Sequence, residues 1–149
     1  MITIIFYGLD QFVVGRLSRE LTPNLAKLFE VKEDEVNFIA PNDLVFHNGV
    51  EQTSWNLLIH VHAPKHCAIV QDEVAEFLLE SIGEVAINKT VEFYYYPEGN
   101  RYEKTNDDYP RYITEENLVD TDTEYDEDIE EGEEDDQIFT GDIFEGIDK

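Results

Sequence analysis

Four side chains that can bind a metal ion or carry a proton lie close together near the middle of the chain. His60 and His62 are two residues apart, and His66 and Cys67 follow them. Zinc takes imidazole nitrogens and thiolates as ligands, so such a set could hold the ion. Neither a Cys-x-x-Cys nor a His-Glu-x-x-His spacing is present, however, and two histidines on one sheet face also pack together or line a subunit contact. The sequence therefore predicts no metal site and no cofactor.

Cys67 is the only cysteine of the chain, so it cannot form an intrachain disulfide. It lies near the start of a predicted helix, where the helix dipole and Lys65 could lower the pKa of its thiol. No nucleophile motif surrounds it, and a lone cysteine at such a place is most often a small packing residue. A chain without disulfides suits a reducing cytoplasm.

Aromatic residues and one cation gather at the end of the last apolar segment. Tyr94, Tyr95, Tyr96 and Tyr102 surround Arg101. Such a patch could line a small-molecule pocket. The β-propensity of tyrosine and its packing across strands explain the same residues without a ligand.

The elements that must position these residues come from a strand-helix-strand unit that occurs twice. Residues 4–41 and 57–97 each begin with an apolar strand, continue with an amphipathic helix and end with a second strand. We expect strands at 2–9, 36–40, 55–63 and 90–96. Between the two units, a turn at residues 47–49 predicts a short hairpin.

Apolar residues at helical spacing predict the buried face of each helix. Asp10 is a suitable N-cap for the first helix, which ends near residue 30, and Pro23 would kink or divide it. Pro64 opens the second helix, and Gly83 fits its C-cap. The predicted stripes are Phe12, Val13, Leu17, Leu21, Leu25, Leu28 and Phe29 in the first helix, and Ala68, Ile69, Val74, Phe77, Leu78 and Ile82 in the second.

The order β-α-β-β-α-β predicts an α/β (α+β) fold with a four-stranded sheet. Each helix can form a right-handed crossover between parallel strands, and both can cover one face of the sheet. On the third strand, Leu58, His60 and His62 face away from the other apolar residues. Because the second face is not purely polar, something else must cover it, and another copy of the chain is the simplest candidate.

Two common folds share this order, the ferredoxin-like sandwich and the tautomerase fold of the macrophage migration inhibitory factor group. Near-equal repeats that each begin with a strand, the first at residue 2, resemble the tautomerase arrangement. More narrowly, residues 1–103 resemble a small bacterial family of unknown function that belongs to that superfamily. The segments that carry the resemblance are Ile4–Gly8, Val36–Ile39, Asn56–Val61 and Val91–Tyr96.

The resemblance implies a homotrimer in which the sheets contact one another. It would also imply keto–enol proton transfer, for which tautomerases use an amino-terminal proline as the general base. Here position 2 is Ile2, and a large residue at that place normally leaves Met1 attached, so that the terminus would be an ordinary primary amine. This departure favours a non-catalytic binding protein over an isomerase.

The superfamily's small-molecule pocket lies beside the amino terminus, at a subunit boundary. If this chain keeps such a pocket, the resemblance implies candidates near the first residues and on the strands beside them. These candidates are Met1, Ile2, His60, His62, Tyr95 and Arg101.

Charge divides the chain into a body and a tail. Residues 1–97 hold 14 Asp/Glu and 6 Lys/Arg, a charge of −8, whereas residues 98–149 hold 21 and 4, a charge of −17. Acid at that density resists compaction, so we expect one domain over residues 1–103 and a mostly disordered tail over 104–149. Binding to nucleic acid or to an anionic membrane surface is disfavoured, because both need cationic side chains.

Within the tail, Ile-Phe occurs twice between Ile138 and Ile147. Apolar pairs in an acidic background resemble a docking segment that orders on a partner, here a basic protein, and a purely solubilising extension is the alternative. No segment has the length of a membrane-spanning helix or the pattern of a signal peptide, so we expect a cytoplasmic protein.

Three functional hypotheses follow from the sequence. The first is a tautomerase-like, homotrimeric binding protein without catalysis. The second is an enzyme that moves a proton with the Met1 amine, His60 or a tyrosine. The third is a ferredoxin-like regulatory domain that binds a small ligand at a dimer interface.

Overall fold

The computed structural model describes residues 1–114, and a compact unit spans Met1–Tyr112. Residues 115–149, with the predicted disorder and the docking segment at 138–147, lie outside the described residues. Arg111 and Tyr112 contact Glu103 and Asp34. Arg111 and Tyr112 both come after residue 103, the end of the domain predicted from the sequence.

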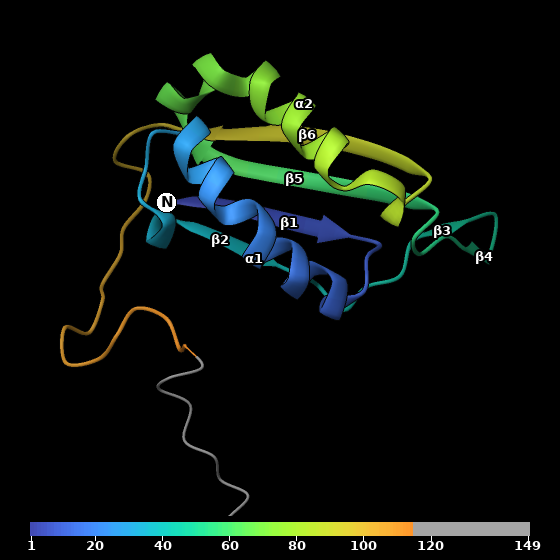
Figure 1. The fold of residues 1–149 in the computed structure, drawn as a ribbon, viewed down its shortest axis with the longest axis horizontal. Coiled ribbons are helices and arrows are strands. Elements are labelled where there is room, and N and C mark those ends of the chain that lie inside the picture. Colours follow the sequence, from blue (N-terminus) through green and yellow to red (C-terminus); the bar gives the residue numbers. More distant parts are fainter. Residues whose placement is uncertain (115–149) are drawn as a thin grey trace, which may run out of the picture. The chain divides into compact units, whose positions relative to one another are not determined.

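Four strands form one sheet in the order β2-β1-β5-β6 (Figure 1). They are β1 (Ile2–Tyr7), β2 (Val36–Ile39), β5 (Asn56–Pro64) and β6 (Asn88–Tyr96). The two strands of each unit are parallel neighbours, and the central pair, β1 and β5, is antiparallel. The units have similar lengths, since Ile2 pairs with Val36 and Asn56 pairs with Asn88. The predicted duplication is therefore confirmed in the strand pairing.

This strand order separates the two folds that the sequence left open. A ferredoxin-like domain is built from split β-α-β units, in which another strand lies between the two strands of a unit. Here β1 lies directly beside β2, and β5 lies directly beside β6. The ferredoxin-like hypothesis is therefore wrong, and the tautomerase-like arrangement is the observed one.

Both long helices, α1 (Gln11–Leu28) and α2 (Gln71–Ser81), cover the same face of the sheet (Figure 1). The N-cap expected at Asp10 is confirmed, because its carboxylate accepts a hydrogen bond from the backbone N–H of Phe12 at 2.8 Å. Of the two outcomes expected at Pro23, a kink or a division, the division does not occur, because α1 continues through Pro23 as one helix. Gly83 follows α2 with a φ of 56°, as a C-cap glycine does. Short 3₁₀ turns lie at η1 (Glu33–Glu35), η2 (Lys65–Val70) and η3 (Gly83–Val85).

Three residues of the predicted helix stripes are exposed: Phe12, Ala68 and Ile69. Phe12 is 79% exposed because it lies two positions before Val14, the first buried residue of α1, and two residues in a 3.6-residue turn place it on the opposite side. Ile69 is 89% exposed because residues 65–70 form the 3₁₀ turn η2 rather than the start of the α-helix. With three residues per turn, Cys67 and Val70 share the inward side of η2 and Ile69 points away.

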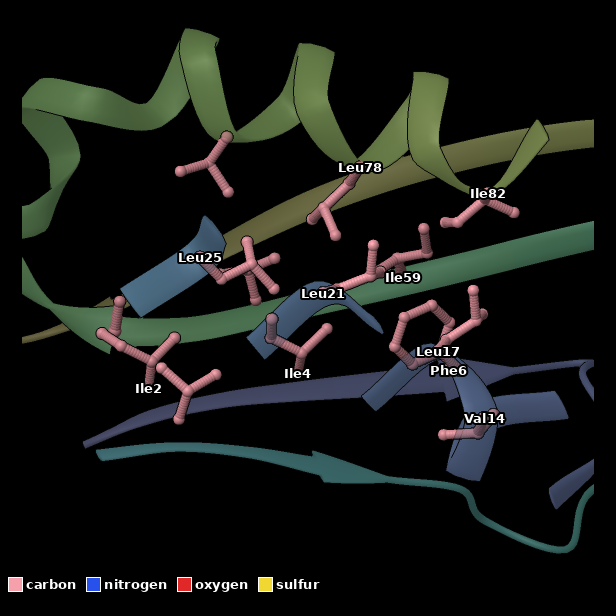
Figure 2. Close-up of a cluster of buried hydrophobic side chains, with 14 of the residues drawn as sticks. Ile2, Ile4, Phe6, Val14, Leu17, Leu21, Leu25, Ile59, Leu78 and Ile82 are labelled. Atoms are coloured by element: carbon pink, nitrogen blue, oxygen red, sulfur yellow. The ribbon is translucent and has the colours of Figure 1, made fainter. Parts of the chain in front are cut away.

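The hydrophobic core lies between the two helices and the sheet (Figure 2). Alternate residues of β1 and β5 point into it, as the period of two in a strand requires. Both repeats contribute, so neither could bury its apolar face alone. The described residues include no buried polar or charged residue. Core side chains with almost no exposure include Ile2, Ile4, Phe6, Leu17, Leu25, Ile59, Val61, Val74, Leu78 and Ile82.

Gly8 connects the end of β1 to the rest of the fold at a point where the backbones approach closely. Its φ is +80°, and a Cβ built there would lie 2.8 Å from the carbonyl oxygen of Asn56 and 2.8 Å from Cγ2 of Val45. Val45 precedes the hairpin of β3 (Phe46–His47) and β4 (Val50–Glu51), whose turn at Asn48 and Gly49 confirms the predicted hairpin. Gly8 therefore allows the hairpin to pack against the end of the sheet.

Replacing Gly8 by alanine is expected to lower the free energy of unfolding by about 2 kcal/mol or more, through the left-handed backbone and the clash with Asn56. Gly15 provides the matched control, because no atom lies within 4 Å of its added Cβ and it is inside α1. Gly15→Ala should stabilise the protein by about 0.5–1 kcal/mol. Urea unfolding of both variants measures the difference, and equal effects at the two sites would contradict this role for Gly8.

Candidate functional site

The face of the sheet opposite the helices, here called the open face, carries the candidate site. No helix or strand among the described residues covers it as α1 and α2 cover the other face, and residues 100–102 border part of it (Figure 1). Its side chains are apolar, aromatic and polar in mixture, and most of those on β1 and β5 are half-buried. Strand register and burial place on this face Thr3, Ile5, Tyr7, Asn37, Ile39, Asn56, Leu58, His60, His62, Pro64, Asn88, Thr90, Glu92, Tyr94 and Tyr96.

Four rings on three neighbouring strands, β1, β5 and β6, form a ring cluster on the open face: Tyr7, His60, His62 and Tyr94. His62 stacks on Tyr94, with ring centroids 4.9 Å apart and an interplanar angle of 14°. The ring centroid of His60 lies 4.7 Å from that of Tyr94 and 4.8 Å from that of Tyr7. The cluster forms because His62 pairs with Tyr94 across β5 and β6, while His60 is two residues earlier on the same side of β5.

Glu92 is the acid of this cluster. Its carboxylate accepts a 2.6 Å hydrogen bond from the hydroxyl of Tyr94, and this bond is the main reason that the pKa of Tyr94 is raised. Oε2 of Glu92 also lies 3.2 Å from Nε2 of His60, without the alignment of a hydrogen bond. The pKa of His62 is lowered, first by desolvation and then by the neighbouring His60. The lowered pKa favours the neutral form of His62.

A shallow hollow of about 470 Å³ adjoins the ring cluster and is called here the Arg101 hollow. His62 belongs to both, so the two features form one continuous site. The hollow brings a guanidinium, an imidazole, phenol rings and an apolar strand residue to one place. Its lining residues are Thr3, Ile5, His62, Tyr96, Asn100, Arg101 and Tyr102.

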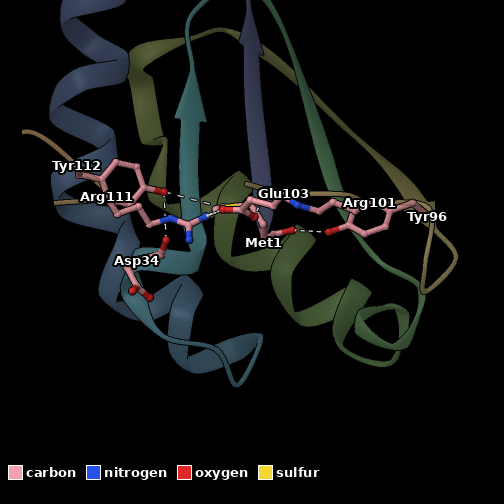
Figure 3. A network of polar contacts seen from close by, with 7 residues as sticks. All are labelled: Met1, Asp34, Tyr96, Arg101, Glu103, Arg111 and Tyr112. Carbon is pink, nitrogen blue, oxygen red and sulfur yellow. Dashed lines mark hydrogen bonds and ion pairs between the residues drawn. The ribbon is translucent and has the colours of Figure 1, made fainter. Parts of the chain in front are cut away.

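Polar contacts hold the wall of the hollow against the first residue of the chain (Figure 3). The hydroxyl of Tyr96 donates a 2.7 Å hydrogen bond to the carbonyl oxygen of Met1. Arg101 binds the carboxylate of Glu103 at 2.9 Å, and Arg111 binds the other oxygen of the same carboxylate. These contacts position Arg101 at the edge of the open face.

A second set of contacts ties the following segment to the edge of the sheet (Figure 3). Tyr112 donates a 3.1 Å hydrogen bond to the carbonyl oxygen of Asp34, just before β2. Its hydroxyl and Arg111 both lie 3.9 Å from the sulfur of Met1. Residues 101–112 therefore run from one side of the sheet to the other beside Met1.

The structure brings together some of the residues that the sequence analysis proposed for a pocket. His62 and Arg101 line the hollow, His60 lies in the ring cluster beside it, and Met1 is tied to its wall through Tyr96. Ile2 and Tyr95, in contrast, lie on the helix-covered side of the sheet. Ile2 is fully buried, and Tyr95 donates a hydrogen bond to Gln71, so neither can line a pocket on the open face.

Tyr7 and Glu92 were not singled out from the sequence, and Tyr94 and Tyr96 were named only in the aromatic patch, not among the pocket candidates. Tyr94 and Tyr96 could have been chosen over Tyr95 by alternation, had the strand's phase been known. Tyr7 and Glu92 depend on strand pairing, because Tyr7 lies opposite Leu58 and Glu92 lies opposite His60. Only a predicted register would have revealed them.

The four side chains considered as a metal set do not converge. His60 and His62 lie on the open face, His66 is exposed beside Glu98 with a 3.4 Å contact, and Cys67 is buried in the core. Within residues 1–114, no group of three or more His, Cys, Asp or Glu side chains has the spacing to hold a metal ion.

Cys67 is only 3% exposed, and desolvation raises the pKa of its thiol, opposite to the lowering that Lys65 and a helix dipole suggested. The short turn η2 turns this side chain into the core rather than toward solvent. The folded protein is therefore expected to react with iodoacetamide at neutral pH much more slowly than the protein in denaturant, since the thiolate is the reactive form. Mass spectrometry of the two samples tests this, and equal labelling rates would show that the thiol is accessible.

Comparison with known proteins shows which fold carries this site. No protein-family model matches the sequence, and no curated protein matches it at a significant level. A domain of unknown function from Sebaldella termitidis has a similar structure, with a TM-score of 0.63, 21% sequence identity, and coverage of 69% of this chain and 95% of that one.

Two solved structures of the macrophage migration inhibitory factor group are similar as well. The factor homologue from Prochlorococcus marinus has a TM-score of 0.54 and 17% identity, and the match covers 69% of this chain and 94% of that one. The macrophage migration inhibitory factor-like protein from Entamoeba histolytica has a TM-score of 0.53 and 10% identity, and the match covers 69% of this chain and 93% of that one. The chain thus has the tautomerase-like fold that the repeat pattern predicted. No helix among the described residues is long and apolar enough to cross a membrane.

Proposed function

We propose that this chain is a non-catalytic binding protein that assembles as a homotrimer through the open faces of its sheets. The observation that carries the proposal is the contrast between the two faces of the sheet. One face is covered by α1 and α2, and the other presents half-buried Ile5, Leu58 and the ring cluster with no described element over it. An apolar and aromatic surface of this kind is typical of a contact between protein chains.

The composition of the open face supports a contact between copies. Its strands carry Tyr7, Leu58 and Tyr94 but present a single carboxylate, Glu92, and no lysine or arginine within the described residues. Contacts between identical subunits are similarly depleted in charge at their centre and enriched in aromatic residues. The number of three subunits is taken from the resemblance to tautomerases. The proposed location of the protein is a reducing cytoplasm.

The non-catalytic part of the proposal rests on the residues that the fold places near the start of β1. Residue 2 contributes a fully buried aliphatic side chain to the core and supplies no base. A fold shared with tautomerases does not by itself confer their reaction.

Native mass spectrometry of the full chain tests the assembly. A trimer is expected at three times the chain mass of 17.3 kDa. A monomer at micromolar concentration would contradict the proposal as a whole, whereas a dimer would contradict only the subunit number.

Proton transfer on a small enolisable acid is the second candidate function, and the Arg101 hollow is the observation that favours it. The neutral form of His62 is favoured and can accept a proton, and Arg101 could bind a carboxylate. An assay with the enol of phenylpyruvate, comparing wild type with His62→Gln, tests it. A rate in wild type that the variant loses would establish catalysis, and equal rates near the uncatalysed value would leave the binding function.

The acidic tail supports a separate proposal that rests on sequence alone. Residues 98–149 carry a charge of −17, and the Ile-Phe pairs between Ile138 and Ile147 provide apolar anchors. Such a segment suits a basic protein partner. Salt-sensitive binding of the full chain to a basic protein, lost on deletion of residues 115–149, would support this partner class.

A further inference from the structure

The open face offers few groups that can change its charge. On its four strands, the titratable side chains are Tyr7, His60, His62, Glu92, Tyr94 and Tyr96. Tyrosine and glutamate side chains ordinarily change charge outside the range from pH 5 to pH 8. Histidine is the residue type whose charge ordinarily changes in that range, and the open face carries two, His60 and His62.

The two histidines differ in what surrounds them. His60 has Glu92 beside it at 3.2 Å, so a proton gained by His60 is compensated by a carboxylate on the next strand. His62 has no carboxylate among the contacts described for it. On β6 it stacks on the neutral ring of Tyr94, on β5 it lies next to His60, and on β1 it pairs with Thr3. Arg101, which follows β6, lines the same hollow as His62.

A charge on His62 would therefore have a second imidazole beside it and no carboxylate among its described contacts. Within a subunit contact the cost rises, because burial disfavours a charge that has no partner. Desolvation and His60 already lower the pKa of His62 in the single chain. A lowered pKa means that the structure favours the neutral form of the histidine. The contribution of His62 to the stability of the contact is therefore present at neutral pH and is lost as pH falls below about 6.5.

We propose that His62 makes the subunit contact sensitive to acid, so that the assembly dissociates when its imidazole is protonated. This inference rests on the proposed contact between open faces and adds a means of control to it. His60 is not the trigger, because its protonation forms an ion pair with Glu92 rather than an isolated charge. The two histidines thus have opposite roles although they lie two residues apart on one strand.

Analytical ultracentrifugation of the full chain from about pH 8 to about pH 5.5 tests this on wild type, His62→Gln and His60→Gln. Glutamine removes the titration while keeping a polar side chain of moderate size. In wild type and His60→Gln, the dissociation constant of the assembly is expected to rise at least about tenfold over this range. In His62→Gln, it should change much less.

The outcomes separate this inference from the proposed function. A wild-type chain that is monomeric at pH 8 would overturn the proposed contact and this inference with it. A wild-type assembly that persists at pH 5.5 would overturn the inference alone. Equal dissociation of the assembly at low pH in wild type and His62→Gln would also overturn it, because groups other than His62 would then be responsible. Circular dichroism at each pH distinguishes dissociation from unfolding.

Discussion

Replacing Phe6 by alanine is expected to lower the free energy of unfolding by about 3–5 kcal/mol, because it removes a large side chain from a core that cannot collapse around the cavity. Phe6 is fully buried at the end of β1 and stacks on Phe38 of β2, with ring centroids 5.9 Å apart. Figure 2 shows it between α1 and the sheet, close to Leu17 and Val14. A loss of this size is a large part of the stability of a small domain.

Phe12→Ala is the matched control, because it removes the same atoms from a side chain that is 79% exposed. Its effect should stay within about 0.5 kcal/mol. Guanidinium unfolding at a fixed protein concentration measures both variants, since an assembling protein is stabilised by its own concentration. Similar losses for the two phenylalanines would show that the core does not lie where the structure places it.

Replacing Leu58 by glutamate is expected to raise the dissociation constant of the assembly at least about a hundredfold, equivalent to about 2.8 kcal/mol. Leu58 is half-buried on the open face, between Tyr7 on β1 and Thr90 on β6. A carboxylate at this place would be buried without a partner in the contact and repelled by its copies, each penalty being several kcal/mol. In the separated chain it would face solvent, so the fold should remain.

The control for this prediction is Leu79→Glu on the outer side of α2, where the leucine is 36% exposed. It introduces the same charge on the helix-covered side of the molecule. Size-exclusion chromatography with light scattering should find this variant assembled like wild type and Leu58→Glu monomeric. If both variants, or neither, changed the mass, the open face would not be the contact surface.

Most of the fold could be predicted from the sequence because it depends on local patterns. Strand alternation on β5 correctly placed Leu58, His60 and His62 on one face, and the N-cap at Asp10 was identified from residue type. The helix stripes failed at Phe12, and at Ala68 and Ile69, where a 3₁₀ turn replaced an α-helix. Sequence periodicity alone does not separate the two over a single turn.

The site was harder to predict because it depends on which strands are neighbours. His60 and His62 could be identified as a pair, but Glu92 and Tyr94 join them only through the parallel register of β5 and β6. Tyr95 was chosen instead of Tyr94 and Tyr96 because three tyrosines in a row do not reveal the phase of their strand. The contacts of Arg111 and Tyr112 with Glu103 and Asp34 are also long-range, and no local motif marks them.

Histidine acylation with diethyl pyrocarbonate tests most directly whether sister chains cover the open face. The chain contains its own controls, because His47 on the hairpin and His66 on η2 are exposed and lie outside the four strands of the sheet. At neutral pH, His60 and His62 should be modified several-fold more slowly in wild type than in Leu58→Glu, while His47 and His66 react equally in both. Equal rates at His60 and His62 in the two proteins would mean that the open face is bare, and the account would be wrong.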